Sequence, residues 1–328
     1  MSAPLLEVRD LSIASIRHGI AQPIVDAVSF TVERGEILGM VGESGSGKTV
    51  TCRALMRLFP TSNLKITGGE IRLDGTDIAK AQEAELRKIR GRRIGMIFQN
   101  PSSHLDPIMS IGKQIGETLK VHKQITAPEA RSLAVELLRQ VGIPDPQNRV
   151  DNYPFEFSGG MRQRAMIALA LACDPDLLIA DEPTTALDVT IQAQILRLLL
   201  DLRDRRGLGA ILITHDLAVV AQTCDRVAVM YAGRLCESGP KREVLKAPRH
   251  PYTRKLIACQ PSAGIGNGGS FANIPGQPPS VTSYPSGCRF HPRCEKAMAR
   301  CSHDVPEAVT IDRRHIVACH AVLSGKAA

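Results

Sequence analysis

Apolar and polar positions follow two patterns along this chain. Near the start, residues 6–9 and 28–33 alternate between apolar and polar, as in a strand with one face in water. Five later segments are almost wholly apolar, which is typical of strands buried on both faces. These segments are 36–41, 94–98, 177–180, 211–214 and 227–231. Helix-like segments separate them, so the sequence predicts an α/β fold with a mostly parallel sheet.

Residues 101–157 differ from this pattern and predict a helical insertion. Thr126 and Glu129 have the spacing of a capping box, with a proline just inside the helix start. The apolar residues that follow are expected on one face of a helix; they are Leu133, Leu137, Leu138 and Val141. Gly142 and Pro144 then end the helix.

Composition is that of a globular protein with a basic surface. The chain has 328 residues, of which 43% are hydrophobic and 23% charged. The net charge of +8 comes from 41 basic and 33 acidic residues. Because the basic residues are scattered, they indicate a solvated surface, with attraction to an anionic membrane or to nucleic acid as the alternative. Aromatic residues are only 3%, which argues against base stacking on single strands.

The sequence also predicts the compartment. No apolar run is long enough to span a bilayer. Glu7, Arg9 and Asp10 interrupt any apolar core of a signal peptide. We therefore expect folding in the cytoplasm, with the nine cysteines as reduced thiols or metal ligands.

A phosphate-binding loop is predicted where segment 36–41 ends. Residues 42–49 match the pattern G-x-x-x-x-G-K-[ST], and a helix-like segment follows at 50–59. Glycines let backbone N–H groups turn toward phosphate oxygens, Lys48 neutralises the β- and γ-phosphates, and Thr49 ligates Mg²⁺. The residues predicted to bind ATP are Gly42, Glu43, Ser44, Gly45, Ser46, Gly47, Lys48 and Thr49.

Two carboxylates follow the apolar segment 177–180. Asp181 stands at the strand end, where a carboxylate can hold the Mg²⁺ shell. Glu182 comes one residue later and could accept a proton from the attacking water. With the phosphate loop upstream, the pair predicts the second half of an ATP site.

Further motifs, in the same order along the chain, resemble those of the ABC ATPase family. Residues 157–164 resemble its LSGGQ signature, with Met161 in place of the usual Gln. Gln99 resembles the Q-loop glutamine, Asp188 the D-loop aspartate and His215 the switch histidine. The resemblance covers about residues 5–250. It departs at residues 15–18, Ser-Ile-Arg-His, where the family usually has an aromatic residue against adenine.

The resemblance implies a P-loop NTPase (RecA-like) core in an α/β fold, with an antiparallel β subdomain and a helical insertion. The ATPase domain would span residues 1–250, with the helical subdomain at about 101–157. Glu182 and His215 would be catalytic. Gln99 would join the residues that bind ATP, and Mg²⁺ would be held through Thr49, Gln99 and Asp181. In a face-to-face dimer, the signature would bind ATP held by the other subunit; its residues are Ser158, Gly159, Gly160 and Met161.

Other classes of ATPase fit less well. A DNA-repair or chromosome-type ABC ATPase normally carries a long coiled-coil insertion, which this sequence lacks. A P-loop kinase or GTPase would lack the signature motif. Within the family, the chain resembles the ATPase subunits of oligopeptide and dipeptide permeases; the residues that carry this are 42–49, 157–164, 250–253 and 287–294.

That narrower resemblance implies an importer of di- or oligopeptides, with nickel chelates, glutathione or another small solute as the alternative cargo. The expected partners are a second, different ATPase subunit, two membrane permease subunits and an extracytoplasmic solute-binding protein. No nucleic acid is expected. The chain would work as a peripheral protein on the cytoplasmic face of the inner membrane.

The last 41 residues carry a cysteine array. Residues 260–287 are rich in Gly, Pro and Ser, which predicts a linker within a C-terminal extension at 251–328. The array, C-x5-C-x6-C-x17-C, consists of Cys288, Cys294, Cys301 and Cys319. A metal centre would supply folding energy that this apolar-poor segment lacks. Spacing alone leaves zinc, with nearby histidines as further ligands, and a [4Fe–4S] cluster level. The permease resemblance favours [4Fe–4S].

Overall fold

The computed structural model describes residues 3–184, 188–260, 273–312 and 314–324. The chain folds into two compact units, each built from separate stretches of sequence. The first comprises Met1–Leu5, Val32–Glu36 and Lys80–Ile213, and the second Leu6–Thr31, Ile37–Ala79 and Thr214–Ala328. Neither unit ends at residue 250, so the predicted boundary between ATPase domain and extension stays a prediction.

The first unit contains three of the predicted buried strands. They are β6 (Ile94–Ile97), β7 (Leu177–Asp181) and β8 (Gly209–Ile213). β7 pairs in parallel with both neighbours, and every residue of the three strands is buried. The prediction from the apolar segments at 94–98, 177–180 and 211–214 is therefore confirmed.

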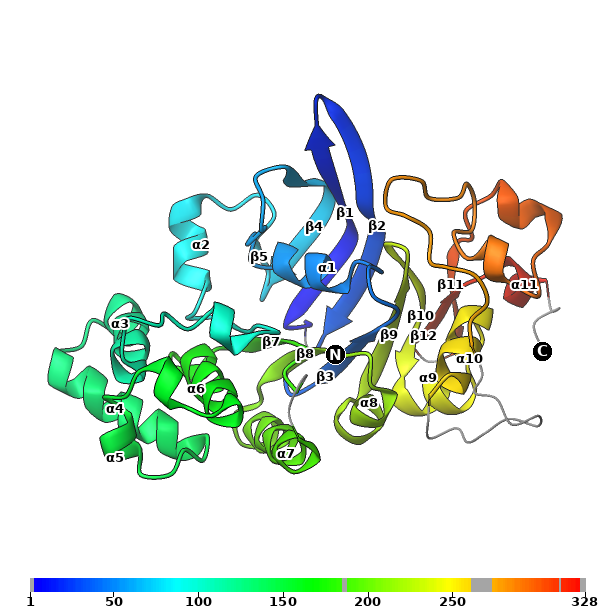
Figure 1. Cartoon of the computed structure of the whole chain (residues 1–328). Helices are drawn as coiled ribbons and strands as arrows, with labels where there is room; N and C mark the ends of the chain where they lie inside the picture. The colour runs from blue at the N-terminus through cyan, green and yellow to red at the C-terminus, as the bar shows by residue number, and fades with distance from the viewer. Residues whose placement is uncertain (1–2, 185–187, 261–272, 313, 325–328) are drawn as a thin grey trace. The chain divides into compact units, whose positions relative to one another are not determined.

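Helices make up most of the rest of the first unit (Figure 1). They are α2 (Glu83–Ile89), α3 (Ile111–Lys123), α4 (Ala127–Gln140), α5 (Pro146–Arg149), α6 (Gly159–Leu171) and α7 (Val189–Arg206). The segment predicted to be a helical insertion holds α3, α4 and α5. The capping box is formed as predicted, because the Thr126 N–H and hydroxyl donate to Glu129 Oε2 at 2.8 and 2.7 Å.

One residue of the predicted apolar face of α4 lies elsewhere. Leu137, Leu138 and Val141 are buried, but Leu133 is 39% exposed. The buried face is centred on Ala134 and Leu138, four residues apart, which leaves Leu133 at its edge. Small alanines on this face let α4 pack close to its neighbours. A prediction based on large apolar residues alone does not count alanines as part of the buried face.

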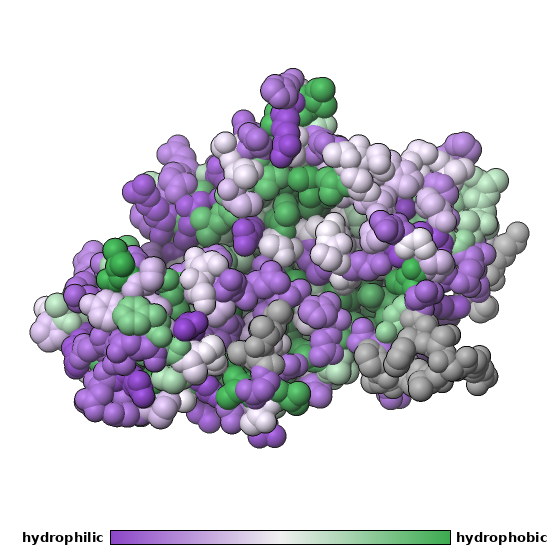
Figure 2. Space-filling model, in the orientation of Figure 1, coloured by the Kyte–Doolittle hydropathy of each residue, from purple (hydrophilic) through white to green (hydrophobic). Residues whose placement is uncertain are grey.

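The second unit has two sheets. One has the order β2-β1-β4-β5, with antiparallel pairing of β1 to β4 and β4 to β5. Its strands are β1 (Leu6–Arg17), β2 (Ile20–Val32), β4 (Leu64–Leu73) and β5 (Thr76–Asp77). The hairpin of β1 and β2 turns at His18 and Gly19, which both have positive φ as a tight hairpin turn requires. On the face in Figure 2, apolar side chains gather beside this hairpin, and most of the remaining surface is hydrophilic.

The other strands of the second unit run in the order β11-β12-β10-β9-β3. They are β3 (Ile37–Val41), β9 (Arg226–Tyr231), β10 (Arg234–Pro240), β11 (Ala308–Asp312) and β12 (His315–Ala318). β3 and β9 are parallel and fully buried, as predicted, while the other pairs are antiparallel. The helices are α1 (Lys48–Ala54), α8 (Leu217–Thr223), α9 (Lys241–Lys246), α10 (Pro251–Ala258) and α11 (His320–Leu323).

The C-terminal segment joins this sheet, which the sequence did not predict. β12 pairs with β10, and a buried contact reinforces the pairing, because His315 Nε2 lies 2.8 Å from Glu237 Oε1. Glu237 also accepts the backbone N–H groups of Arg249 and His250. Burial by itself would raise the pKa of Glu237, but these hydrogen bonds outweigh it and lower the pKa. The carboxylate thus ties β10, the start of α10 and β12 together.

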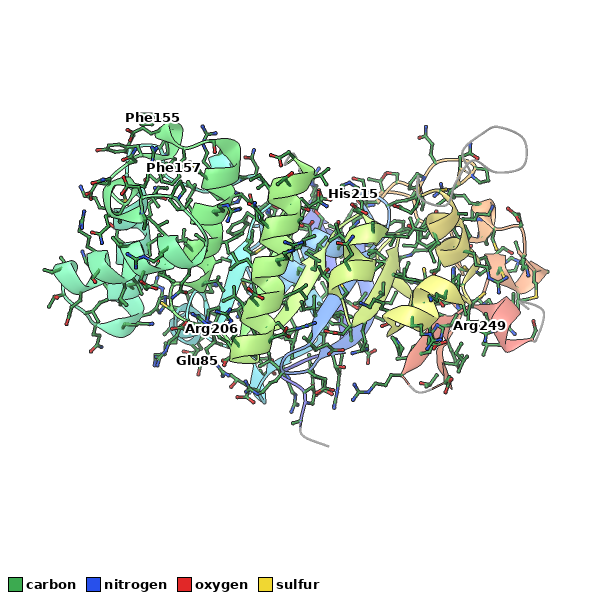
Figure 3. The ribbon with its side chains drawn as sticks, turned by 90° about the horizontal axis from the view of Figure 1, so that it is seen from below. Glu85, Phe155, Phe157, Arg206, His215 and Arg249 are labelled. Carbon is green, nitrogen blue, oxygen red and sulfur yellow. The ribbon has the colours of Figure 1, made fainter. Side chains whose placement is uncertain are left out.

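Exposed apolar residues occur at the surface of the first unit. Phe155 is 67% exposed and stacks on Tyr153 with ring centroids 5.5 Å apart, whereas Phe157, two residues on, is buried (Figure 3). Ile108 is 86% exposed. Among the described residues, no helix combines the length and apolar character needed to cross a membrane.

Candidate active site

Two glycines give the phosphate loop a shape that other residues cannot take. Gly42, directly after β3, has φ 147°, and a Cβ there would lie 2.1 Å from the carbonyl oxygen of Met230 in β9. Gly47 has φ 99°, and a Cβ there would touch Gly233 and Val25 at 3.4 Å. The loop therefore packs its backbone directly on β9 and on the turn that follows it.

Lys48 is folded against this loop. Its side chain is buried, and Nζ donates to the carbonyl oxygens of Gly42 and Glu43, both at 2.8 Å, and to the Ser46 hydroxyl at 3.2 Å. A charged donor with several acceptors holds its position well. The loop thus carries a fixed positive charge beside the glycine-shaped backbone, and Thr49 follows at the start of α1.

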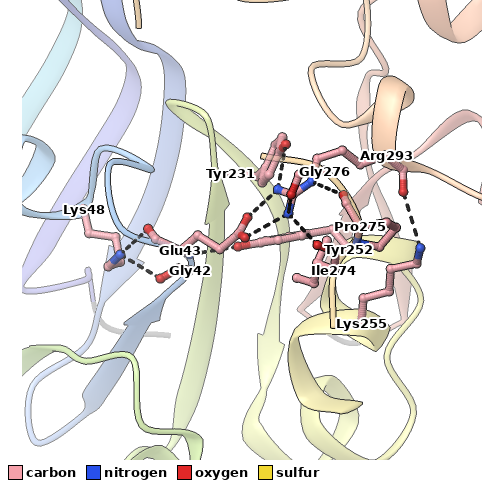
Figure 4. Close-up of polar contacts among 10 residues, drawn as sticks. All are labelled: Gly42, Glu43, Lys48, Tyr231, Tyr252, Lys255, Ile274, Pro275, Gly276 and Arg293. Carbon is pink, nitrogen blue, oxygen red and sulfur yellow. Dashed lines mark hydrogen bonds and ion pairs between the residues drawn. The ribbon is translucent and has the colours of Figure 1, made fainter. Parts of the chain in front are cut away.

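The opposite side of the loop is held by residues far away in the sequence (Figure 4). The Glu43 N–H donates to Tyr252 Oη at 2.9 Å. The Glu43 carboxylate forms a bidentate ion pair with Arg293, with N–O distances of 2.8 and 3.1 Å. Arg293 also donates to Tyr231 Oη at 3.2 Å. These contacts connect the phosphate loop to α10 and to the C-terminal extension.

The first unit contains the predicted carboxylates at the end of β7. Asp181 is buried at 1% exposure. Glu182 has φ 48°, a left-handed conformation that is uncommon for a non-glycine residue and costs roughly 1–3 kcal/mol. Its N–H donates to the Ile213 carbonyl at 3.0 Å, and its Oε2 accepts from Gln99 Nε2 at 2.9 Å. The structure therefore brings together two of the predicted site residues, Gln99 and Glu182.

The signature segment begins helix α6. Ser158 is the N-cap of α6, and its Oγ accepts the Met161 N–H at 3.3 Å. A Cβ on Gly159 would meet nothing within 4 Å, whereas one on Gly160 would lie 3.3 Å from Ile191 of α7. Asp188 caps α7 by accepting the Ile191 N–H at 2.8 Å. The starts of α6 and α7 are therefore neighbours, and Gly159 leaves open space beside the cap.

His215 lies in the second unit and is exposed. It follows Thr214, whose hydroxyl accepts the Asp216 N–H at 3.0 Å, and Asp216 caps α8. The predicted residues thus fall into two groups. The second unit holds residues 42–49 and His215; the first holds Gln99, Asp181, Glu182, Asp188 and residues 158–161. Residues 185–187 of the D-loop-like motif lie outside the described residues.

The four tail cysteines are described and carry no disulfide. Burial is the main reason that the pKa of Cys288 rises to about 11, and the nearby thiols of Cys301, Cys319 and Cys294 add to the rise. Within the described ranges, however, no three His, Cys, Asp or Glu side chains meet closely enough to hold a metal ion.

Two of these thiols also contact other groups. Cys301 Sγ accepts the Met298 N–H at 3.4 Å, and Cys319 packs in a small apolar cluster with Val317 and Ala321. The arrangement therefore does not fit a metal or [4Fe–4S] site as it stands. The predicted cluster receives no support from it.

Comparison with known protein families shows which family this chain belongs to. A model of the ABC transporter family matches residues 25–185, and a model of the oligopeptide/dipeptide transporter C-terminal region matches residues 236–301. A probable peptide ABC transporter ATP-binding protein of Sinorhizobium fredii is 48% identical, over 96% of this chain and 94% of its own. The chain belongs to the ABC transporter ATP-binding proteins. Two further relatives come from Bacillus subtilis.

Those relatives match along nearly their whole length. The dipeptide transport ATP-binding protein DppD is 45% identical, covering 98% of both chains. The oligopeptide transport ATP-binding protein OppD is 48% identical, covering 95% of this chain and 87% of its own. Among solved structures, a dimeric ATP-binding cassette in a post-hydrolysis state with ADP and phosphate matches with a TM-score of 0.65. It is 26% identical and covers 72% of this chain and 99% of its own.

Sequence reasoning missed the residues that hold the phosphate loop from outside. Tyr252 and Arg293 contact Glu43, and Tyr231 contacts Arg293. Tyr252 lies in the segment 250–253 that carried the permease resemblance, but nothing in the sequence gave it a role. Arg293 lies beside Cys294, in a segment that was interpreted only as part of a metal-binding cysteine array. A basic residue in a turn is usually solvated, so the pattern contained no signal for a buried ion pair.

Proposed function

We propose that this chain is the ATP-binding and hydrolysing subunit of an importer of di- or oligopeptides. The observation that carries the proposal is the glycine-shaped loop at 42–47 that closes on the buried Lys48. Such a loop presents backbone N–H groups and one fixed cation, which suits the phosphates of a nucleotide. The full-length similarity to peptide and dipeptide transport proteins supports the choice of cargo.

Each site residue has a role in this proposal. Lys48 binds the β- and γ-phosphates, and Thr49, Gln99 and Asp181 hold Mg²⁺, which neutralises developing phosphate charge when bound. Glu182 accepts the proton of the attacking water. Its contact with Gln99 supports that role, because an amide donor fixes the carboxylate in one orientation. His215 orients the γ-phosphate.

The signature acts on the ATP of a second ATPase subunit. Ser158 and the N–H groups at the start of α6 form an anion-binding helix start, and the open space at Gly159 leaves room for a phosphate. Asp188, at the neighbouring start of α7, belongs to the same contact surface. The solved relative that is a dimer with ADP and phosphate supports this arrangement. We propose a different chain as the partner.

The remaining partners are two membrane permease subunits, and a solute-binding protein delivers cargo from outside. The chain binds the permease subunits from the cytoplasmic face of the inner membrane. The exposed apolar side chains of the helical segment, Ile108, Tyr153 and Phe155, support a contact with another protein.

Assembly should therefore control activity. We expect the isolated chain to hydrolyse ATP slowly, because it provides only half of each composite site. Addition of its partner ATPase and the permease subunits in detergent or nanodiscs should raise turnover by at least about tenfold, since the trans signature then stabilises the transition state. Phosphate release measured before and after assembly tests this. A monomer that is fully active, with its mass confirmed by light scattering during turnover, would contradict the proposal.

We also propose that the tail cysteines bind a metal centre, a [4Fe–4S] cluster in preference to zinc. The proposal rests on the C-x5-C-x6-C-x17-C spacing and on the small size of the apolar cluster in this segment, which leaves folding energy for a metal centre to supply. Because the described thiols do not converge, they must turn toward one another to bind it. Anaerobic purification should yield a brown protein with about four iron atoms per chain. Stoichiometric zinc would replace iron in this proposal, and an absence of metal would end it.

A further inference from the structure

The C-terminal extension contacts the phosphate loop at Glu43, through Tyr252 of α10 and through Arg293. The contact with the Glu43 carboxylate is made by Arg293, whose side chain is 6% exposed against 22% for that of Glu43. Since a guanidinium and a carboxylate can form two parallel hydrogen bonds, this bidentate pair fixes both distance and orientation. An ion pair with so little exposure to water is screened weakly by salt.

Arg293 is fully engaged on its other side. Its Nε donates to the Pro275 carbonyl at 2.8 Å, and Nη2 donates to the carbonyls of Ile274 and Gly276 at 3.2 and 3.3 Å (Figure 4). Lys255 Nζ holds the Arg293 carbonyl at 3.4 Å. Burial opposes the charge of Arg293, but the contacts with Glu43 and Tyr231 raise its pKa. The guanidinium therefore stays charged and stationary.

The aromatic residues below this pair make the connection rigid. Tyr231, Tyr252 and Phe290 pack with ring centroids 4.6 to 5.3 Å apart, and all three are buried. Tyr252 accepts the Glu43 N–H, so this N–H points toward α10. Tyr252 thus holds the backbone N–H of Glu43 and Arg293 holds its side chain, while the Glu43 carbonyl accepts Lys48 Nζ on the other side of the loop.

We propose that Arg293 is a positioning residue for nucleotide binding, which neutralises Glu43 and holds the phosphate loop in its binding shape. Glu43 is an anion within the loop that binds polyphosphate, so without Arg293 its charge would repel ATP. Removing one partner of a buried ion pair leaves the other charge buried and unpaired, which is strongly destabilising, whereas replacing both partners is often tolerated. This inference rests on the proposed function, because it requires that residues 42–49 bind ATP.

The test uses the full chain, assembled with its partners, and the variants Arg293→Ala, Glu43→Gln and the double variant. We expect Arg293→Ala to raise the Kd for Mg-ATP by about tenfold, equal to about 1.4 kcal/mol. The kcat at saturating ATP should change by less than about twofold, because the residue contacts no reacting atom. Glu43→Gln in the Arg293→Ala background should recover most of the lost affinity, because the repelling charge is then gone.

Arg300→Ala is the matched control. Arg300 lies in the same extension but is 57% exposed and pairs with Asp304 at 3.6 Å on the surface. Its replacement should leave the Kd unchanged. If Arg293→Ala does not fold, Arg293→Lys takes its place with an expected loss of about threefold, because an ammonium group cannot make the bidentate contact.

The possible results separate the two proposals. If the wild-type chain binds no ATP, the proposed function fails. If the wild type binds ATP but folded Arg293 variants bind it equally well, only the role of Arg293 is overturned. A double variant as weak as Arg293→Ala would also overturn it, since Arg293 would then act through the carbonyls at 274–276 and not through Glu43.

Discussion

Replacement of Glu182 by Gln should lower ATP turnover by roughly 10²–10⁴-fold while ATP binding stays near normal. The amide keeps the size of the side chain, and its oxygen can still accept from Gln99 Nε2, as Glu182 Oε2 does at 2.9 Å. The unusual backbone conformation of residue 182 is unchanged by this substitution. Only the basicity of the carboxylate is lost, so a large effect on kcat would come from proton transfer.

The measurement is phosphate release by the assembled transporter, alongside the Kd for Mg-ATP. Glu136→Gln is a suitable control, because Glu136 lies on the exposed side of α4 with Arg139 as its partner. It should leave both quantities unchanged. Turnover of the Glu182 variant within about fivefold of the wild type would remove Glu182 from the role of general base.

The sequence predicted the central strands well because burial on both faces leaves a simple pattern. Segments 94–98 and 227–231 correspond closely to β6 and β9. It predicted the hairpin of β1 and β2 poorly. β1 continues past residue 9 to Arg17 and β2 begins at Ile20, well before residue 28, and both extra stretches mix polar and apolar residues. The signature helix begins at Gly159, because the Ser158 cap permits two glycines in its first turn.

Contacts between distant residues could not be predicted. Arg293 and Glu43 are 250 residues apart, and neither lies in a periodic segment that would reveal its burial. The same holds for His315 and Glu237, whose contact adds β12 to the edge of β10. Such pairs depend on how the extension folds back, and a local pattern contains no information on that. The phosphate loop is the opposite case, because its glycines are required by geometry within the loop itself.

That geometry predicts the second large effect. Gly42→Ala should weaken Mg-ATP binding by at least about 100-fold, because the new methyl group would lie 2.1 Å from the Met230 carbonyl oxygen. Met230 belongs to the fully buried strand β9, so the loop must move and not the strand. The move would displace the Gly42 carbonyl, to which Lys48 Nζ donates at 2.8 Å. Both the backbone shape and the fixed cation of the loop would be disturbed together.

Gly45→Ala separates this steric effect from the general cost of positive φ. Gly45 has φ 75°, but a Cβ there would meet nothing within 4 Å. We expect a strain of about 1–2 kcal/mol and a loss of affinity below about tenfold. The Kd for a fluorescent ATP analogue, with circular dichroism to confirm that both variants are folded, distinguishes the two. Equal affinities in the two variants would show that close packing of the loop on β9 is not what shapes the nucleotide site.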